Sequence, residues 1–316
     1  MFDALAELKD VDINNPFSSN ILSLDQCNSY YKHVTLVINT IEDYISVVDY
    51  LQDESVFIEL VYRGMADDSW ELLPSLGRCE FYFDSAEYEM VRELIHLRPE
   101  EFADLPSDFD MIAKMQHFGL PTRLLDFTRN PLVALYFACS DKETKDGRIV
   151  ITVDSSSIWS HKLIERICSL YRFDDFIRLY LDDFLGDDFT EDEYNKLIAR
   201  PLMEMPKYSN ERMRRQSSLF MVFPNVIKPS RFEGDFKDGC IRKIIQPRIK
   251  PIDDACMQNE MCSIIIPSEF KKTILKQLEM LGINEAYLFP EVEYTAKHVK
   301  EKYASLFVRD EEDNND

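Results

Sequence analysis

Apolar positions recur every three or four residues in several stretches of the chain, and this spacing predicts helices with one buried face. Helices are expected at residues 41–54, 85–102, 108–119, 130–141 and 268–284, and the apolar spacing marks the first, the second and the last of them. Residues that favour helix starts precede three of them, namely Asn39-Thr40, Asn130-Pro131 and Ser268. Gly119 is a plausible residue to follow the end of the third helix.

Short runs of β-branched and aromatic residues predict strands between these helices. The runs lie near residues 34–38, 55–64, 147–154, 217–224 and 261–267, and residues 120–128 form a short strand or turn. The stretch "YLFPEVEY" is expected to end one more strand, at Glu291 and Glu293, which alternatively cap the last helix. Because strands and helices do not alternate regularly, we expect an α+β fold with a mixed, mostly antiparallel central sheet.

The domain organisation expected from these patterns is a single large unit with short additions. Residues 1–50 form an N-terminal lead-in and helix, residues 51–310 form the main domain, and residues 311–316 form an acidic tail. Residues 156–208 are acidic and aromatic and have helical spacing, so we expect a helical insertion or lid there.

Composition excludes several classes of function. The 316 residues carry a formal net charge of −22, which repels polyanions at long range and serves solubility or a basic partner. The chain has only 8 glycines and no glycine-rich phosphate loop. Its 7 scattered cysteines form no metal-binding or disulfide pattern and suit a reducing cytoplasm. No metal site, catalytic triad, signal peptide or membrane span is expected.

An arginine ends the apolar run that leads into "VYRG". A buried guanidinium needs a partner, so Arg63 either pairs with an acidic side chain as scaffold or holds a phosphate or carboxylate ligand. Gly64, which follows directly, would allow the backbone to bend or to approach a ligand closely. Trp70 and the "LLPSLGR" stretch after it are expected to form a second wall.

A second dense segment runs from Gln116 to Asn130, with polar residues interleaved among apolar ones. A rigid polar loop that leads into a helix N-terminus suits an anion or an amide. His117 alone is more often structural than a general base, and Asp126 either acts in chemistry or pairs with Arg63 or Arg123 as scaffold. In a third segment, Glu211 to Gln216, the arginines either attract a phosphate-bearing ligand or form a solvated helix face.

Together these segments resemble the FRG domain family, named for an aromatic-Arg-Gly triplet that is Tyr62-Arg63-Gly64 here. Further landmarks are the stretch from Trp70 to Arg78, the long stretch "QHFGLPTRLLDFTRNPLVALYFA", "RRQSSLF" and the closing "LFP". The chain departs from the family pattern in three places. Phe127 replaces a tryptophan, Ser217-Ser218 stand where a glycine is common, and "EVEY" replaces an acidic, glycine-containing stretch.

The resemblance implies the layout and fold of an ADP-ribosyltransferase, with NAD as substrate. By this analogy Arg63 anchors NAD, and Gln216 stands where a catalytic glutamate is expected. A neutral glutamine keeps a hydrogen bond to the ribose but loses the charge that stabilises an oxocarbenium-like ribose. Asp126 or Glu211 must then supply the charge, and Asp126 is favoured because Phe127 and Tyr136 beside it can stack on nicotinamide.

The expected site residues follow from this analogy. The catalytic residues are Arg63, Asp126 and Gln216, the NAD-binding residues are Tyr62, Arg63, Gly64, Trp70, Gln116, Thr128 and Tyr136, and the target-binding residues are Arg212, Arg214 and Arg215. The implied activity is transfer of ADP-ribose to a protein or nucleic acid by a cytoplasmic bacterial toxin or anti-phage effector, with an antitoxin or chaperone as possible partner. The alternative is a non-catalytic FRG interaction module.

Overall fold

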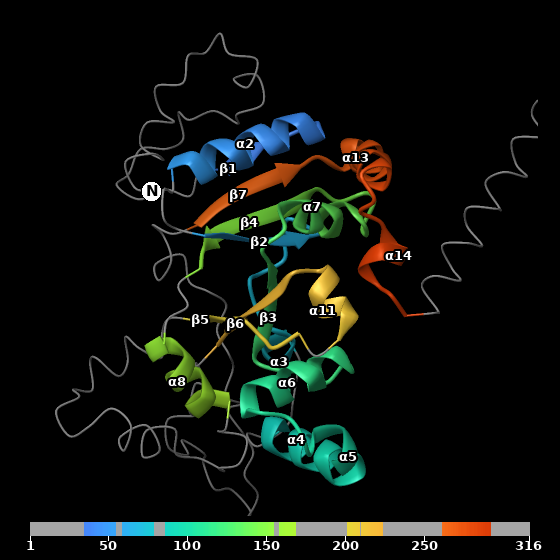
Figure 1. Ribbon diagram of the computed structural model, residues 1–316. Coiled ribbons are helices and arrows are strands. Elements are labelled where there is room, and N and C mark those ends of the chain that lie inside the picture. The colour runs from blue at the N-terminus through green and yellow to red at the C-terminus, as the bar shows by residue number, and fades with distance from the viewer. Residues whose placement is uncertain are drawn as a thin grey trace, which may run out of the picture.

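The computed structural model describes residues 35–54, 59–78, 86–154, 158–168, 201–208, 210–223 and 261–291. Seven strands of these residues form one mixed sheet in the order β1-β7-β4-β2-β3-β6-β5 (Figure 1). The strands are β1 (Thr35–Val37), β2 (Leu60–Met65), β3 (Leu124–Thr128), β4 (Gly147–Val153), β5 (Leu202–Glu204), β6 (Ser218–Val222) and β7 (Met261–Ile266). Only β1 and β7 pair in parallel, so the expected α+β class with a mostly antiparallel sheet is confirmed.

The sheet consists of two halves that meet at a single residue pair. Strand β2 pairs with β4 over six residues, and β3 pairs with β6 over five. Between β2 and β3 only Tyr62 and Thr128 are paired. The backbone ladder is therefore interrupted directly after Tyr62, at Arg63.

Helices cover one face of each half, as Figure 1 shows with α2, α7 and α13 above β2 and with α4, α6 and α8 below β3. The helices are α2 (Ile41–Glu54), α3 (Ser75–Arg78), α4 (Ala86–Leu97), α5 (Pro99–Phe102), α6 (Asp108–His117), α7 (Pro131–Cys139), α8 (Ile158–Cys168), α11 (Glu211–Arg215), α13 (Ser268–Met280) and α14 (Glu285–Leu288). Tyr62 packs in the core cluster with residues of α2, α7 and α13. Its strand partner Thr128 points to the same side of the sheet, because paired residues share a face. A third apolar cluster on the opposite face includes Leu73, just before α3.

Several helix ends lie where the sequence predicts them. The Thr40 hydroxyl accepts from Asp43 N at 3.1 Å, and the Asn130 side chain caps α7. Gly119 follows α6 with a φ of +91°. The expected Ser268 cap is wrong, because Ser268 is already the first residue of α13 and its own N–H donates to Asp146 Oδ1 at 2.8 Å. The cap comes from a neighbouring loop that is distant in sequence.

Two other expectations need correction. The proposed helical insertion at 156–208 contains α8 but also β5, whose Leu202 and Met203 face different apolar clusters on the two sides of the sheet. The stretch before "EVEY" forms α14 instead of a strand, because Asn284 Oδ1 caps it by accepting from Tyr287 N.

The domain boundary expected at residue 50 falls inside α2. Strand β1 pairs with β7, and α2 packs in the same core cluster as α7 and α13, so residues 35–54 are integral to the main unit. Residues 1–34, 169–200 and the acidic tail at 311–316 lie outside the described residues. Within the described part of the chain, no helix is both long and apolar enough to cross a bilayer.

A buried lysine connects the C-terminal part of the chain to the first half of the sheet. Lys271 of α13 is 1% exposed, and its Nζ donates to the backbone oxygens of Ala66 at 2.7 Å and of Asp141 and Lys142 at 3.2 Å. Burial lowers the pKa of this ammonium group. The three carbonyl oxygens compensate for part of the lost hydration, so the side chain serves as a structural cation.

Thr152 offers a direct test of core packing in β4. It is 0% exposed, and its hydroxyl has no hydrogen-bond partner among the described residues. Because a buried hydroxyl without a partner destabilises the folded state, we expect T152V to raise the free energy of unfolding by about 1 kcal/mol. Urea unfolding would measure this change, with T273V on the exposed side of α13 as the control. A clear loss of stability in T152V would contradict the prediction.

Candidate functional site

The candidate site lies where the two helical layers meet, beside the interruption between β2 and β3. Every residue of β3 is buried except Asp126, which is exposed in the middle of the strand. Its carboxylate shares a face with the side chain of Thr128, because alternate strand residues point to the same side. The C-terminus of α6 approaches this strand, and α11 leads into β6 next to it (Figure 1).

Arg63 spans the interruption in the sheet. Its Nη1 donates to the backbone oxygen of Asp126 at 2.6 Å, which is the one hydrogen bond of this side chain among the described residues. Its Nε is buried and has no partner there. Burial lowers the pKa of Arg63 to about 10, while Asp126 opposes this shift and Arg78 adds to it. The group therefore remains a cation at neutral pH and pairs with no carboxylate in the described structure.

The structure requires a glycine at position 64 for a different reason from the expected one. A Cβ atom at this position would overlap the carbonyl oxygen of Ala134 and would lie 2.8 Å from the nitrogen of Ala138. The glycine thus allows close approach of α7 to β2, and not of a ligand. Tyr62 is also buried in the core under α7.

The Asp126 side chain is held by a neighbouring amide. Gln116 Nε2 donates to Asp126 Oδ1 at 2.9 Å, and the Thr122 hydroxyl donates in turn to Gln116 Oε1. Asp126 does not pair with Arg123 as scaffold, because Arg123 forms a buried ion pair with Glu87 of α4. Gln116 therefore contacts the proposed catalytic carboxylate, although the sequence assigned it to NAD binding.

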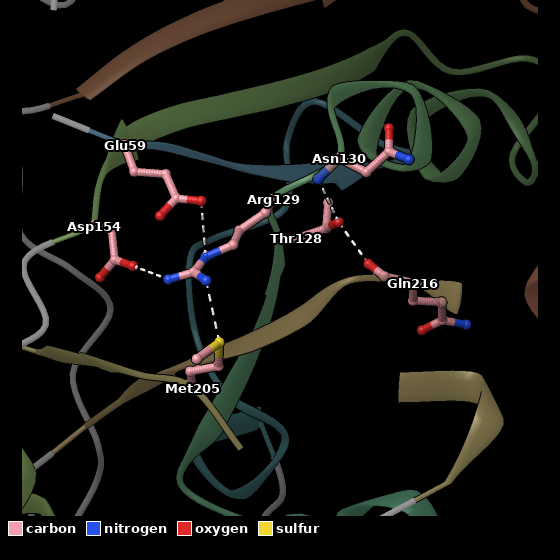
Figure 2. A network of polar contacts seen from close by, with 7 residues as sticks. All are labelled: Glu59, Thr128, Arg129, Asn130, Asp154, Met205 and Gln216. Atoms are coloured by element: carbon pink, nitrogen blue, oxygen red, sulfur yellow. Dashed lines mark hydrogen bonds and ion pairs between the residues drawn. The ribbon is translucent and has the colours of Figure 1, made fainter. Parts of the chain in front are cut away.

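Gln216 and Thr128 meet, as Figure 2 shows. The Thr128 hydroxyl donates to the backbone oxygen of Gln216 at 2.6 Å and accepts from Asn130 N at 3.0 Å. The Gln216 amide itself donates to the backbone oxygen of Leu288, 3.1 Å away. Ser217, where a glycine is common in the family pattern, has a φ of +47° in the region that favours glycine. The turn that positions Gln216 is thus strained by its serine.

Each of the three arginines of α11 has a partner within the protein. Arg214 forms an ion pair with Glu211, and Arg215 Nη1 donates to the backbone oxygen of Tyr287 at 3.1 Å. The Arg212 guanidinium lies 4.6 Å from the ring centre of Phe289. The contacts of Arg212 and Arg215 hold α14 against α11, whereas Arg214 is paired within α11 and its side chain remains exposed.

His117 and Glu291 belong to the same neighbourhood. Burial lowers the pKa of His117, Arg212 adds to this effect, and Glu291 opposes it. The neutral form of His117 is therefore favoured. Glu293, the other acidic residue of the closing stretch, lies outside the described residues.

Arg129 organises the opposite end of the β2–β3 junction (Figure 2). Its guanidinium forms ion pairs with Asp154 at 2.6 Å and Glu59 at 3.2 Å, and Nη1 lies 3.1 Å from the sulfur of Met205. These partners come from the end of β4, the start of β2 and the end of β5. Arg129 therefore stabilises the junction of the two half-sheets.

Aromatic side chains lie in different places from those expected. Phe127 is buried on the sheet face opposite to Asp126, so it cannot stack on a ligand beside that carboxylate. Tyr136 packs in the core cluster under α7, edge-on to Phe137. Trp70 is 38% exposed beyond the end of β2, where its backbone oxygen accepts from Arg148 Nη2 at 2.6 Å.

Three residues near the site were missed in the sequence: Ser75, Arg78 and Thr122. Arg78 is close enough to Arg63 to affect its pKa, and Thr122 contacts Gln116. The only signal for them is their presence in the "PSLGR" and "LPTRLL" stretches. Nothing in the spacing of these stretches shows that they meet.

Comparison with known proteins gives one match. Residues 58–147 match the family model of the FRG domain. This segment contains Arg63, Gln116, Asp126 and Thr128 and ends before α11 and α14. No curated protein and no solved structure matches the chain.

Proposed function

We propose that this chain, whose residues 58–147 form an FRG domain, is an ADP-ribosyltransferase that uses NAD as its substrate. The state of Arg63 carries the proposal. Arg63 is half-buried, and its one hydrogen bond to the described residues goes to a neutral carbonyl oxygen, so its guanidinium retains donor groups for a pyrophosphate. Arg63 lies where the pairing of β2 and β3 is interrupted, and an ADP-ribosyltransferase fold around it is part of the proposal.

A second cation strengthens the argument for an anionic ligand. Arg78 lies near enough to Arg63 to lower the pKa of its guanidinium. Two like charges repel each other, and a bound pyrophosphate would relieve this repulsion. We therefore assign Arg78, together with Arg63, to the proposed pyrophosphate site.

Asp126 is the proposed catalytic carboxylate. In the reaction the bond between C1′ of the ribose and nicotinamide breaks, and nicotinamide leaves as a neutral molecule with the electron pair of that bond. An acceptor atom then bonds to C1′ and loses its proton to solvent. A fixed negative charge beside the ribose stabilises the positive charge that develops on it. Gln216 has no charge, and its amide already binds the backbone of Leu288, so it cannot replace Asp126 in this role.

The proposed acceptor is a protein. The arginines of α11 contact Glu211, Tyr287 and Phe289, and the chain carries a net charge of −22. Both features disfavour a polyanion and favour a partner with a basic surface. A toxin or anti-phage effector in the bacterial cytoplasm, controlled by an antitoxin or chaperone, fits such an activity.

Release of free nicotinamide tests the proposal directly. The purified chain is incubated with NAD in the presence and absence of bacterial extract, and nicotinamide is quantified over time. We expect release by the native chain. Absence of nicotinamide with every extract tested would contradict the enzymatic proposal.

The second candidate function is that of a non-catalytic interaction module. The hydrogen bond from Arg63 to the backbone of Asp126 joins the two half-sheets, so Arg63 can have a purely structural role. Thermal unfolding separates the two. A ligand at 100 times its dissociation constant stabilises a protein by about 2.7 kcal/mol. No change in melting temperature over millimolar NAD, together with no nicotinamide release, would support the module.

Replacing Arg214 distinguishes the two acceptor classes. Its guanidinium is paired with Glu211, so we expect R214Q to leave the salt dependence of transfer to the acceptor unchanged. Labelled NAD would identify the acceptor fraction, and protease or nuclease treatment its class. A salt slope smaller by about 1 in R214Q, with a nuclease-sensitive acceptor, would instead show that Arg214 contacts a phosphate.

A further inference from the structure

We infer that Gln116 and Thr122 are positioning residues for Asp126, and that Ser75 anchors them from the other side of the sheet junction. This inference rests on the proposed function of Asp126. It reassigns Gln116 from contact with NAD to orientation of the carboxylate that acts on NAD. It also gives a role to Ser75 and Thr122, which neither the motifs nor the family match assign.

The orientation of the Gln116 amide follows from the hydrogen bonds behind it. Thr122 Oγ1 accepts from the backbone N–H of Leu124 at 3.2 Å, so its proton is available to donate to Gln116 Oε1. With its oxygen fixed in this way, the amide turns its NH₂ group toward Asp126 and donates to Oδ1 at 2.9 Å. Asp126 Oδ2 has no hydrogen-bond partner among the described residues and stays available for a ribose hydroxyl.

Ser75 fixes the backbone of Thr122. The N–H of Thr122 donates to Ser75 Oγ at 3.1 Å, and the Ser75 hydroxyl lies 3.4 Å from the Thr122 carbonyl oxygen. Leu76 N donates to the same carbonyl oxygen at 3.0 Å. The start of α3 is thereby joined to the loop before β3, and the relay runs from Ser75 through Thr122 and Gln116 to Asp126.

The residues of this relay become more exposed from Thr122 to Asp126. Thr122 is 1% exposed, Gln116 is half-buried and Asp126 is exposed. A surface carboxylate would normally sample several rotamers. The Asp126 carboxylate is held by the Gln116 amide, and the buried Thr122 hydroxyl determines the orientation of that amide. Such preorganisation matters in catalysis because misplacement by about 1 Å can reduce a rate about 100-fold.

The test removes the Thr122 hydroxyl while its volume is kept. We expect T122V to lower kcat for nicotinamide release about 10-fold with a KM for NAD within about twofold of native, because the charge remains but its position is lost. T122S keeps the hydroxyl and should recover most of the rate. T152V is the matched control, since it removes another buried threonine hydroxyl outside the relay.

A second readout does not depend on activity. Deuterium exchange of the Gln116 side-chain amide protons, followed by NMR, should be slow in the native chain and in T122S and faster in T122V. Native kcat in a folded T122V, or equally fast exchange in all three proteins, would overturn the inference. If the native chain releases no nicotinamide, the proposed function fails, and the exchange measurement still decides whether Thr122 orients Gln116.

Discussion

Replacing Gly64 with alanine is expected to unfold the protein or to lower the free energy of unfolding by more than about 3 kcal/mol. The new Cβ would overlap the Ala134 carbonyl oxygen and approach the Ala138 nitrogen to 2.8 Å. Both atoms belong to the backbone of α7, so no side-chain rotation can relieve the clash. The helix would have to move away from β2 and would lose packing in the core cluster below it.

Circular dichroism and urea unfolding of G64A measure this effect, and G119A is the matched control. Gly119 has a φ of +91° and no atom within 4 Å of a built Cβ, so G119A should lose only about 1 kcal/mol from backbone strain. Equal stability losses in the two variants would show that α7 does not pack against Gly64 as described.

Replacing Asp126 with asparagine is expected to lower the rate of nicotinamide release about 100-fold while the fold is kept. The side chain is exposed, and asparagine can still accept the Gln116 hydrogen bond through its own oxygen. The change therefore removes the charge with little disturbance of the structure. It is a cleaner test than R63A, because removal of Arg63 would also break a contact between the two half-sheets.

The same assay should be applied to D104N, which neutralises an exposed aspartate after α5. We expect D104N to release nicotinamide at the native rate. A D126N rate within a factor of two of native, in a protein that does release nicotinamide, would move the catalytic role to another acidic group such as Glu211, a second candidate from the sequence.

Local features of the fold could be predicted because their causes are local. The spacing of apolar residues places α2, α4 and α13, and Asn130-Pro131 marks the start of α7. Asn284 was overlooked as a cap, so α14 was predicted as the end of a strand. Strand β5 is only three residues long, which is too short for its alternation to stand out in an acidic, aromatic stretch.

The candidate site was predicted less completely because its contacts join distant residues. The sequence pointed to Arg63, Asp126 and Gln216. In the structure Arg63 contacts Asp126, and Thr128 contacts Gln216. The sequence did not show that Gln116 contacts Asp126 or that Phe127 faces the opposite side of the sheet. Arg212 and Arg215 of α11 looked available because their partners, Phe289 and Tyr287, lie more than seventy residues further along the chain.

The contacts of Lys271 show how far the fold extends beyond residues 58–147, which match the FRG domain model. The Lys271 ammonium group binds three backbone oxygens that all lie within residues 58–147, yet it belongs to a helix more than one hundred residues beyond that segment. Excision of the matched segment would expose those oxygens and would remove all of β4 after Gly147, the strand that joins β2 to β7. The matched segment is thus part of a larger folded unit, and a stable shortened protein needs the strands at both ends of the sheet.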